Sequence, residues 1–243
     1  MLGPFEVRTD DGVLADVPGA RLRGLLTALA LEPGHAVPKA ALVDWIWGER
    51  PPSDAANALQ RLVSRLRKAL PQGSVEGQAD GYRLTADPDA VDAVRFERLV
   101  GQARHDGDPR LLREALALWR GAAMQGVGLA DSAAFDAAVT RLEGLRLTAM
   151  EDRFDAEIRL GHGGELVTEL TDLVAAHPVR ERLVAALMRA LVATGRDEGT
   201  HQRGDEPFPH RMRGHQVGQF RDQLRAVAEA DLLLEPILHG HQA

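Results

Sequence analysis

The sequence predicts a mainly α-helical protein with a small amount of β structure, divided into an N-terminal and a C-terminal domain. Three observations predict this fold class. Residues 1–88 contain three segments of helical periodicity flanked by short extended runs, whereas the extended runs disappear from residue 89 onward. Beyond that point, helical patterns alternate with Pro and Gly breaks. The chain of 243 residues is long enough for one or two domains with buried cores.

The N-terminal domain begins with extended segments and two short helices. Residues 2–7 and 13–17 flank the turn signal Asp10-Asp11-Gly12, so we expect them to form a β-hairpin. Apolar residues at helical spacing then predict helices over residues 21–31 and 39–47, each of which ends at a glycine- or proline-containing stretch.

The third helical segment, residues 53–70, carries the most informative pattern in the chain. Ser53 and Asp54 are good N-caps, and Pro71 follows the last residue. One face is apolar, with Leu59, Leu62, Val63, Leu66 and Leu70. The opposite face and its flanks carry Asn57, Gln60, Arg61, Ser64, Arg65, Arg67 and Lys68, without an acid. Such side chains bind base edges and phosphates in a major groove, although the solvated face of an ordinary amphipathic helix has the same pattern.

The charge distribution indicates a local and not a general affinity for anions. The net charge of −7 argues against a chain that coats nucleic acid indiscriminately, and the positive charge is concentrated in residues 53–70. Cysteine is absent, which excludes disulfides and a thiol nucleophile. Because no apolar run approaches ~20 residues and the N-terminus lacks a signal-peptide pattern, we expect a cytoplasmic protein without a membrane span.

A second hairpin follows the third helix. Val75 and residues 82–84 lie on short extended runs around Ala79-Asp80-Gly81. Extended runs, three helices and a closing hairpin are the layout of a winged helix-turn-helix, in which the third helix reads DNA and the hairpin is the wing. This context favours the DNA-reading interpretation of residues 53–70.

The C-terminal domain is predicted to be a helical array. Short loops join antiparallel helices of similar length, which is typical of tetratricopeptide-like repeats, although a plain helical bundle that supports the winged helix is an equal alternative. We expect Asp152, Asp155 and Glu157 to form a solvated helix face. The predicted helices cover residues 92–106, 109–121, 132–161, 164–176 and 179–194.

Several motifs, taken in order from about residue 2 to residue 195, resemble the Streptomyces antibiotic regulatory protein family. They are residues 2–7 (LGPFEV), 42–52 (LVDWIWGERPP), 57–60 (NALQ), 63–67 (VSRLR), 81–84 (GYRL), 115–121 (ALALWRG) and 177–183 (HPVRERL). The resemblance implies an OmpR-like winged helix over residues 1–88 and a helical bacterial transcriptional activator domain over residues 89–195.

The resemblance also implies a function and a set of contact residues. It implies a transcription activator that binds direct repeats near promoters of secondary-metabolite genes and contacts RNA polymerase. Gly81 and Tyr82 are then a turn and a wing anchor, and Trp45 and Trp47 are core residues between helices. By position, the DNA-facing residues are Asn57, Gln60, Arg61, Ser64, Arg65, Arg67 and, in the wing, Arg83; we add Lys68 as a phosphate contact.

The resemblance stops after Gly195. Residues 196–210 are expected to break any helix, and only residues 219–234 regain a helical pattern. Residues 196–243 are therefore interpreted as a divergent tail or as the product of a shifted reading frame.

No pattern in the chain indicates catalysis or a bound cofactor. There is no glycine-rich phosphate loop and no convergent Ser/His/Asp spacing, and the five histidines of the tail are too irregularly spaced to predict a metal site. We therefore expect neither enzymatic activity nor a cofactor. Two alternatives stay open. In the first, the chain is a DNA-binding regulator, which would bind DNA as a homodimer or as a tandem assembly. In the second, it is a helical scaffold or ligand sensor whose winged helix contacts proteins.

Overall fold

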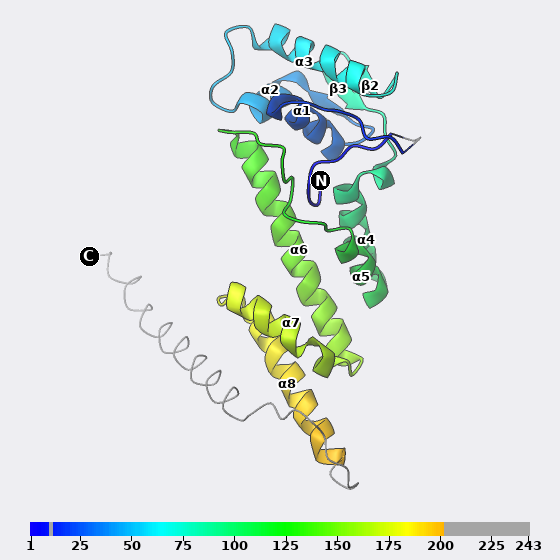
Figure 1. The fold of residues 1–243 in the computed structure, drawn as a ribbon, viewed down its shortest axis with the longest axis vertical. Helices are drawn as coiled ribbons and strands as arrows, with labels where there is room; N and C mark the ends of the chain where they lie inside the picture. Colours follow the sequence, from blue (N-terminus) through cyan, green and yellow to red (C-terminus); the bar gives the residue numbers. More distant parts are fainter. Residues whose placement is uncertain (10–11, 202–243) are drawn as a thin grey trace, which may run out of the picture. The chain divides into compact units, whose positions relative to one another are not determined.

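The computed structural model describes residues 1–9 and 12–201, and Met1–Arg196 form one compact unit. The predicted fold class is confirmed, because helices predominate and a small sheet lies among the first three of them (Figure 1). In chain order the elements are α1 (Ala20–Leu31), β1 (Ala36–Pro38), α2 (Lys39–Trp47), α3 (Ala55–Ala69), β2 (Val75–Gly77), β3 (Gly81–Leu84), the 3₁₀ helix η1 (Pro88–Ala90), α4 (Asp92–Asp106), α5 (Pro109–Ala117), α6 (Ala133–Arg159), α7 (Gly163–Ala176) and α8 (Glu181–His201).

The N-terminal part has the architecture of a winged helix. Helices α1, α2 and α3 pack on one another through fully buried leucines such as Leu25, Leu42 and Leu66. The sheet is antiparallel with strand order β1-β3-β2, and the hairpin β2–β3 is the predicted wing. Tyr82 is 8% exposed and joins the same core, so it anchors the wing as expected.

Strand β1 lies between the first two helices, where the sequence did not predict an extended segment. Its Ala36, Val37 and Pro38 pair with β3 in the register Val37 to Tyr82 and Pro38 to Gly81. A proline is tolerated here because β1 is an edge strand. Gly81 permits the pairing, since a Cβ at this position would collide with the carbonyl oxygen of Val37.

The predicted N-terminal hairpin is wrong for its first half. Leu2 forms an isolated bridge with Ala123 in the segment that follows α5, and the Phe5 amide donates to the Gln125 carbonyl at 2.8 Å. Leu2 is completely buried with α4 and α5, and this burial outweighs the weak local strand pattern. Of the expected hairpin, the part next to the turn is present: Arg8 and Leu14 form an isolated bridge, the Thr9 amide donates to the Val13 carbonyl at 3.0 Å, and the Ala15 amide donates to the Val7 carbonyl at 2.9 Å.

The C-terminal helices occur where helical patterns were predicted, with two differences at their ends. Helix α5 ends at Ala117, and the following Trp119 packs edge to face on Phe96 of α4 with ring centroids 5.4 Å apart. Helix α8 continues to His201, into the stretch that was expected to break helices. Gly195 costs such a helix only about 1 kcal/mol. The helix expected over 219–234 lies outside the described residues, and the divisions at residues 88 and 195 stay predictions.

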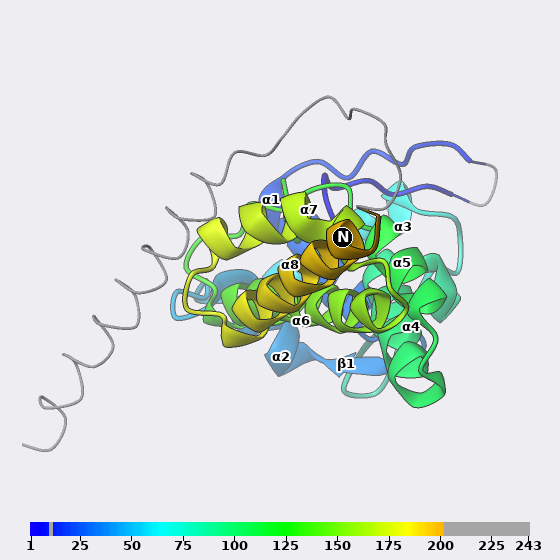
Figure 2. The ribbon, with the colours of Figure 1, turned by 90° about the horizontal axis from the view of Figure 1, so that it is seen from below.

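Helix α6 connects the winged helix with α7 and α8, which lie against its far half (Figure 1, Figure 2). Its N-cap residue Ser132 accepts a hydrogen bond from the Phe135 amide and donates one to the Trp45 carbonyl of α2 at 2.7 Å. The Trp45 indole donates to the Gly24 carbonyl, and its ring packs on Phe135 at 5.8 Å. Trp45 is therefore half-buried and packs against both the winged-helix core and the core of α4 to α6, whereas Trp47 is buried as expected.

The acidic residues of α6 do not form the solvated face that was expected. Glu151 is 4% exposed and Glu157 7% exposed. Arg180, just before α8, binds Glu151, and Arg189 of α8 binds Asp155. Arg182 reaches both Asp152 at 2.8 Å and Asp155 at 3.0 Å. Asp152 and Asp155 share a face as expected, and arginines of α8 cover it, which periodicity could not show. Glu157 was wrongly assigned to that face, because it lies about 200° around the helix from Asp155 and pairs with Arg113 of α5.

Candidate nucleic-acid interface

Helix α3 is held with one face in the core and the other in solvent. The Asp54 carboxylate caps its N-terminus by accepting from the Asn57 amide at 3.1 Å, so Asp54 and not Ser53 is the cap. Leu59 and Leu66 are 1% and 0% exposed, as the apolar spacing predicted. Lys68 lies in the last helical turn, where a positive charge is favoured by the helix dipole.

The predicted contact residues of α3 are all exposed and spread across its solvent face in three rows. Successive residues of a helix are rotated by about 100°, so Asn57, Ser64 and Lys68 point in nearly the same direction and form the central row. Gln60 lies on one flank, where it borders a hollow of about 430 Å³ together with Lys39 and Tyr82. Arg61 and Arg65 lie on the opposite flank.

The cations of this face differ in whether they already contact another part of the protein. Arg61, Arg65 and Lys68 make no ion pair with any described residue, so their charges are available to a partner. Arg67 is also exposed, but its Nε donates to the Val75 carbonyl of β2 at 2.9 Å. Arg67 therefore ties the end of α3 to the wing.

The wing residue Arg83 is half-buried and paired. Its guanidinium binds the Glu76 carboxylate of β2 across the hairpin at 2.5 Å, and its Nε is buried without a hydrogen-bond partner. Glu76 and Arg83 are direct neighbours in the β2–β3 register. The sequence pattern did not reveal this acid next to the predicted phosphate contact, because the register of the hairpin was needed to pair them.

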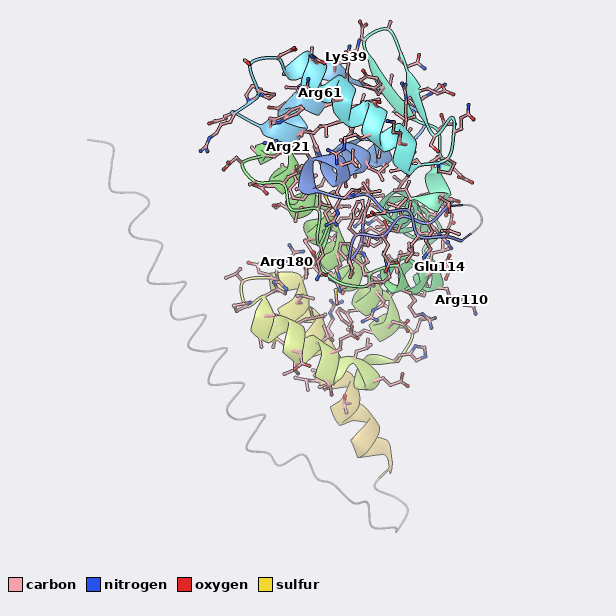
Figure 3. The ribbon with its side chains drawn as sticks, turned by 45° about the horizontal axis from the view of Figure 1, so that its top comes forward. Arg21, Lys39, Arg61, Arg110, Glu114 and Arg180 are labelled. Atoms are coloured by element: carbon pink, nitrogen blue, oxygen red, sulfur yellow. The ribbon has the colours of Figure 1, made fainter. Side chains whose placement is uncertain are left out.

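Sequence reasoning missed three further cations near α3. Lys39 donates from Nζ to the Ala79 carbonyl in the turn of the wing, and Arg21 and Arg50 border the same hollow as Arg61 and Arg65. Figure 3 shows Arg21 and Arg61 toward the same edge of the winged helix. Their positions in α1 and before α3 carry no periodic signal, so only the tertiary packing brings them to the interface.

Other kinds of site find no support within residues 1–9 and 12–201. These residues contain no group of three or more His, Asp or Glu side chains arranged to hold a metal ion. Four of the five tail histidines considered above lie outside the described residues, and the fifth, His201, is the last residue of α8. None of the described helices combines the length and the apolar character that crossing a bilayer requires.

Two family models match the chain in succession. The model described as "Transcriptional regulatory protein, C terminal" matches residues 19–84, which contain α1 to β3. The model described as "Bacterial transcriptional activator domain" matches residues 91–200, which contain α4 to α8. The second match passes Gly195, the last residue that the motif resemblance covers.

Regulatory proteins of Streptomyces and Mycobacterium share most of the described chain. The regulatory protein DnrI of Streptomyces peucetius is 34% identical over 214 residues, which are 81% of this chain and 78% of DnrI. AfsR of Streptomyces griseus is 39% identical over 203 residues, but the chain spans only 20% of AfsR. The solved structure of Mycobacterium tuberculosis EmbR in complex with a low affinity phosphopeptide superposes with a TM-score of 0.70 at 28% identity, covering 82% of this chain and 55% of that one.

The fold and the exposed basic helix define a winged-helix transcriptional regulator, and the matched relatives are regulators and not enzymes. The chain belongs to the Streptomyces antibiotic regulatory protein family, in which an OmpR-like winged helix precedes a bacterial transcriptional activator domain.

Proposed function

We propose that the chain is a sequence-specific DNA-binding activator that inserts α3 into the major groove of its operator. The observation that carries this proposal is the solvent face of α3, which presents four basic residues and no acid between Asn57 and Lys68 while its opposite face is buried. A helix of this kind, third in a winged helix, has the position and the chemistry of a recognition helix.

The residues of this face divide by chemistry into base readers and phosphate contacts. Asn57 and Gln60 carry the amides that bind adenine edges, and Arg61 carries the guanidinium that binds guanine. Ser64, Arg65, Arg67 and Lys68 lie farther along α3 and contact the phosphodiester backbone. Arg83 reaches a phosphate from the wing, for which it exchanges part of its contact with Glu76.

The relatives support the rest of the proposal. The Streptomyces regulators RedD and DnrI each align with 81% of this chain, which supports a role in the control of secondary-metabolite genes. We infer that two copies occupy adjacent direct repeats near a promoter, as a homodimer or a tandem pair, and that the complex contacts RNA polymerase. The chain then works in the cytoplasm, where the bacterial chromosome lies.

Selection of bound duplexes from a random-sequence library tests DNA recognition directly, because such a library contains every candidate operator. We expect an enriched motif that occurs twice in the same orientation, and a mobility shift on that duplex. Arg61→Ala should lose roughly 1–3 kcal/mol of binding free energy on the selected duplex and should relax the preference at one base pair. Arg110→Ala, which removes an exposed arginine at the start of α5, is the matched control and should bind normally.

The outcomes of this selection separate the proposal from its alternative. If no motif is enriched, the winged helix serves protein contacts in a scaffold or sensor, and the proposal is wrong. If Arg61→Ala loses the same free energy on every sequence, Arg61 contacts phosphate and does not read a base. A single motif without a repeat would contradict the tandem arrangement alone.

A further inference from the structure

A groove of about 830 Å³ runs along the flank of α3 that lies away from Gln60. Its walls come from the start of α1, the end of α2, α3 itself and residues 128–131, which precede α6. The floor is apolar and includes Ile46, Trp47 and Leu62. Arg61 and Arg65 form the wall on the α3 side, so the groove is continuous with the proposed recognition surface.

Four arginines line this groove, and three of them are unpaired among the described residues. Arg21, Arg61 and Arg65 are exposed and make no ion pair. The Arg21 guanidinium lies over the ring of Trp47 at 5.9 Å, which holds it at the rim. Arg50 is 81% exposed and contacts a single acid, Asp131, at 3.5 Å. The groove is therefore a concentrated positive region on a chain of net charge −7.

We propose that this groove binds the phosphodiester backbone of double-stranded DNA beside the major groove that α3 occupies, with Arg21 and Arg50 as contacts beyond the recognition helix. This inference rests on the proposed function. Charge complementarity and continuity with α3 favour a DNA backbone as the occupant. A straight duplex held against Arg61 and Arg65 continues along the same flank, and arginine binds phosphate through up to two parallel hydrogen bonds.

Asp131 gives the helical domain a direct influence on this groove. It lies one residue before the N-cap of α6 and binds Arg50, so it competes with a phosphate for that guanidinium. Gly48 secures its position, because a Cβ there would collide with the Asp131 carbonyl oxygen. Asp131 has a φ of 61°, a left-handed conformation that Asn also adopts readily. Asp131→Asn thus removes the charge without straining the backbone.

Salt-dependent binding of the full chain tests the groove. The probe is the duplex selected from the random library, with flanking base pairs on both sides. The variants are Arg21→Gln/Arg50→Gln, the charge-conserving Arg21→Lys/Arg50→Lys, and Arg110→Gln as a matched control far from the groove (Figure 3). Each phosphate contact contributes about 0.9 to the slope of log K against log salt concentration, so the glutamine pair should lower the slope by about two units.

The lysine pair should retain most of the slope, and Arg110→Gln all of it. Hydroxyl-radical footprinting should show that the glutamine pair loses protection at one end of the site and keeps it at the centre. Asp131→Asn should bind roughly twofold to fivefold more tightly at low salt, in the range expected for one exposed charge contact. This increase should vanish when Arg50 is replaced as well.

Two results would contradict the groove assignment without contradicting the proposed function. If the glutamine pair keeps the wild-type slope and footprint while Lys68→Ala lowers the slope, DNA binds through α3 without the groove. Unchanged DNA binding together with reduced transcription in a purified system would assign the groove to a protein partner. If the wild-type chain selects no duplex at all, both the proposed function and the groove assignment fail.

Discussion

Arg67 and Lys68 are adjacent basic residues at the end of α3, but, within the described residues, only Arg67 binds another part of the protein. Arg67 points its Nε at the Val75 carbonyl of the wing, whereas the adjacent Lys68 is exposed and unpaired among the described residues. One residue step along a helix turns the side chain by about 100°, which is enough to separate a wing contact from a solvent contact. Residue type alone therefore does not define a phosphate contact in this helix.

Replacing Lys68 and Arg67 one at a time should separate the contribution to DNA binding from the contribution to stability. Lys68→Ala should lower the salt slope of DNA binding by about one unit and lower the free energy of unfolding by no more than about 0.3 kcal/mol, the low end of an exposed helix-dipole contact. Arg67→Ala should lower the salt slope as well. It should also lower the free energy of unfolding by roughly 1 kcal/mol, because the hydrogen bond to β2 is lost. Urea denaturation and salt-dependent mobility shifts measure the two quantities. Equal stability losses in the two variants would contradict the structural role of Arg67.

At the scale of elements, the helices and the wing hairpin were predictable, and the other extended segments were not. The leucines of α3 fall at helical spacing and are buried, and the solvent-facing contact residues lie opposite to them, as the sequence indicates. Strand β1 has three residues, too few for a periodic pattern, and exists because Val37 pairs with Tyr82. Leu2 packs against residues more than a hundred positions away, which no local pattern can reveal.

The candidate site also has a part that was predictable from the sequence and a part that was not. Its residues on α3 follow from one amphipathic helix, but the partners of Arg67 and Arg83 and the approach of Arg21 and Arg50 depend on tertiary contacts. The two aspartates in the second half of α6 illustrate the same limit: their shared face is visible in the sequence, and the arginines that cover it are not.

The attachment of α8 to α6 should depend on pH through Asp152. Burial by itself would raise the pKa of Asp152, but hydrogen bonds from Arg182 and Arg104 and their positive charges outweigh it and lower the pKa below its ordinary value. A lowered pKa in the folded state contributes stability above the unfolded pKa of about 3.9, and this stability is lost as the pH falls through the folded value.

Asp152→Asn should therefore lower the free energy of unfolding by roughly 1 kcal/mol at neutral pH. The difference between wild type and variant should shrink as the pH falls below about 4, where the wild-type carboxylate also becomes neutral. Urea denaturation of both proteins across this range measures it. A difference that stays constant with pH would show that the charge of Asp152 does not stabilise the α6–α8 contact.

For the whole molecule, the hydrogen bond between Ser132 and Trp45 joins α6 to the winged helix within one compact unit, Met1–Arg196. Ser132 caps α6 and binds the Trp45 carbonyl with the same hydroxyl group. Ser132→Ala should cost about 1–2 kcal/mol, the loss of one N-cap and one hydrogen bond. Ser132→Thr retains the hydroxyl and is the control.

If the unit unfolds as a whole, this loss should appear equally in both of its parts. Native-state hydrogen exchange should show the same decrease in opening free energy for the slowest amides of α3 and of α4. A decrease confined to α4 and α6 would mean that the winged helix unfolds independently.

The anchoring of α6 at one end also has a mechanical consequence. With its 27 residues the helix is about 40 Å long. Its first turn is fixed to α2 through Ser132 and Phe135, and its last turns carry α7 and α8. A tilt of about one degree about the fixed end displaces the far end by about 0.7 Å, following from the length of the helix. The contacts of α6 with α4 and α5, among them Arg141 with Glu97 and Arg104 with Asp152, therefore have to resist such a tilt to keep the α2 junction in place when a force acts on α7 or α8.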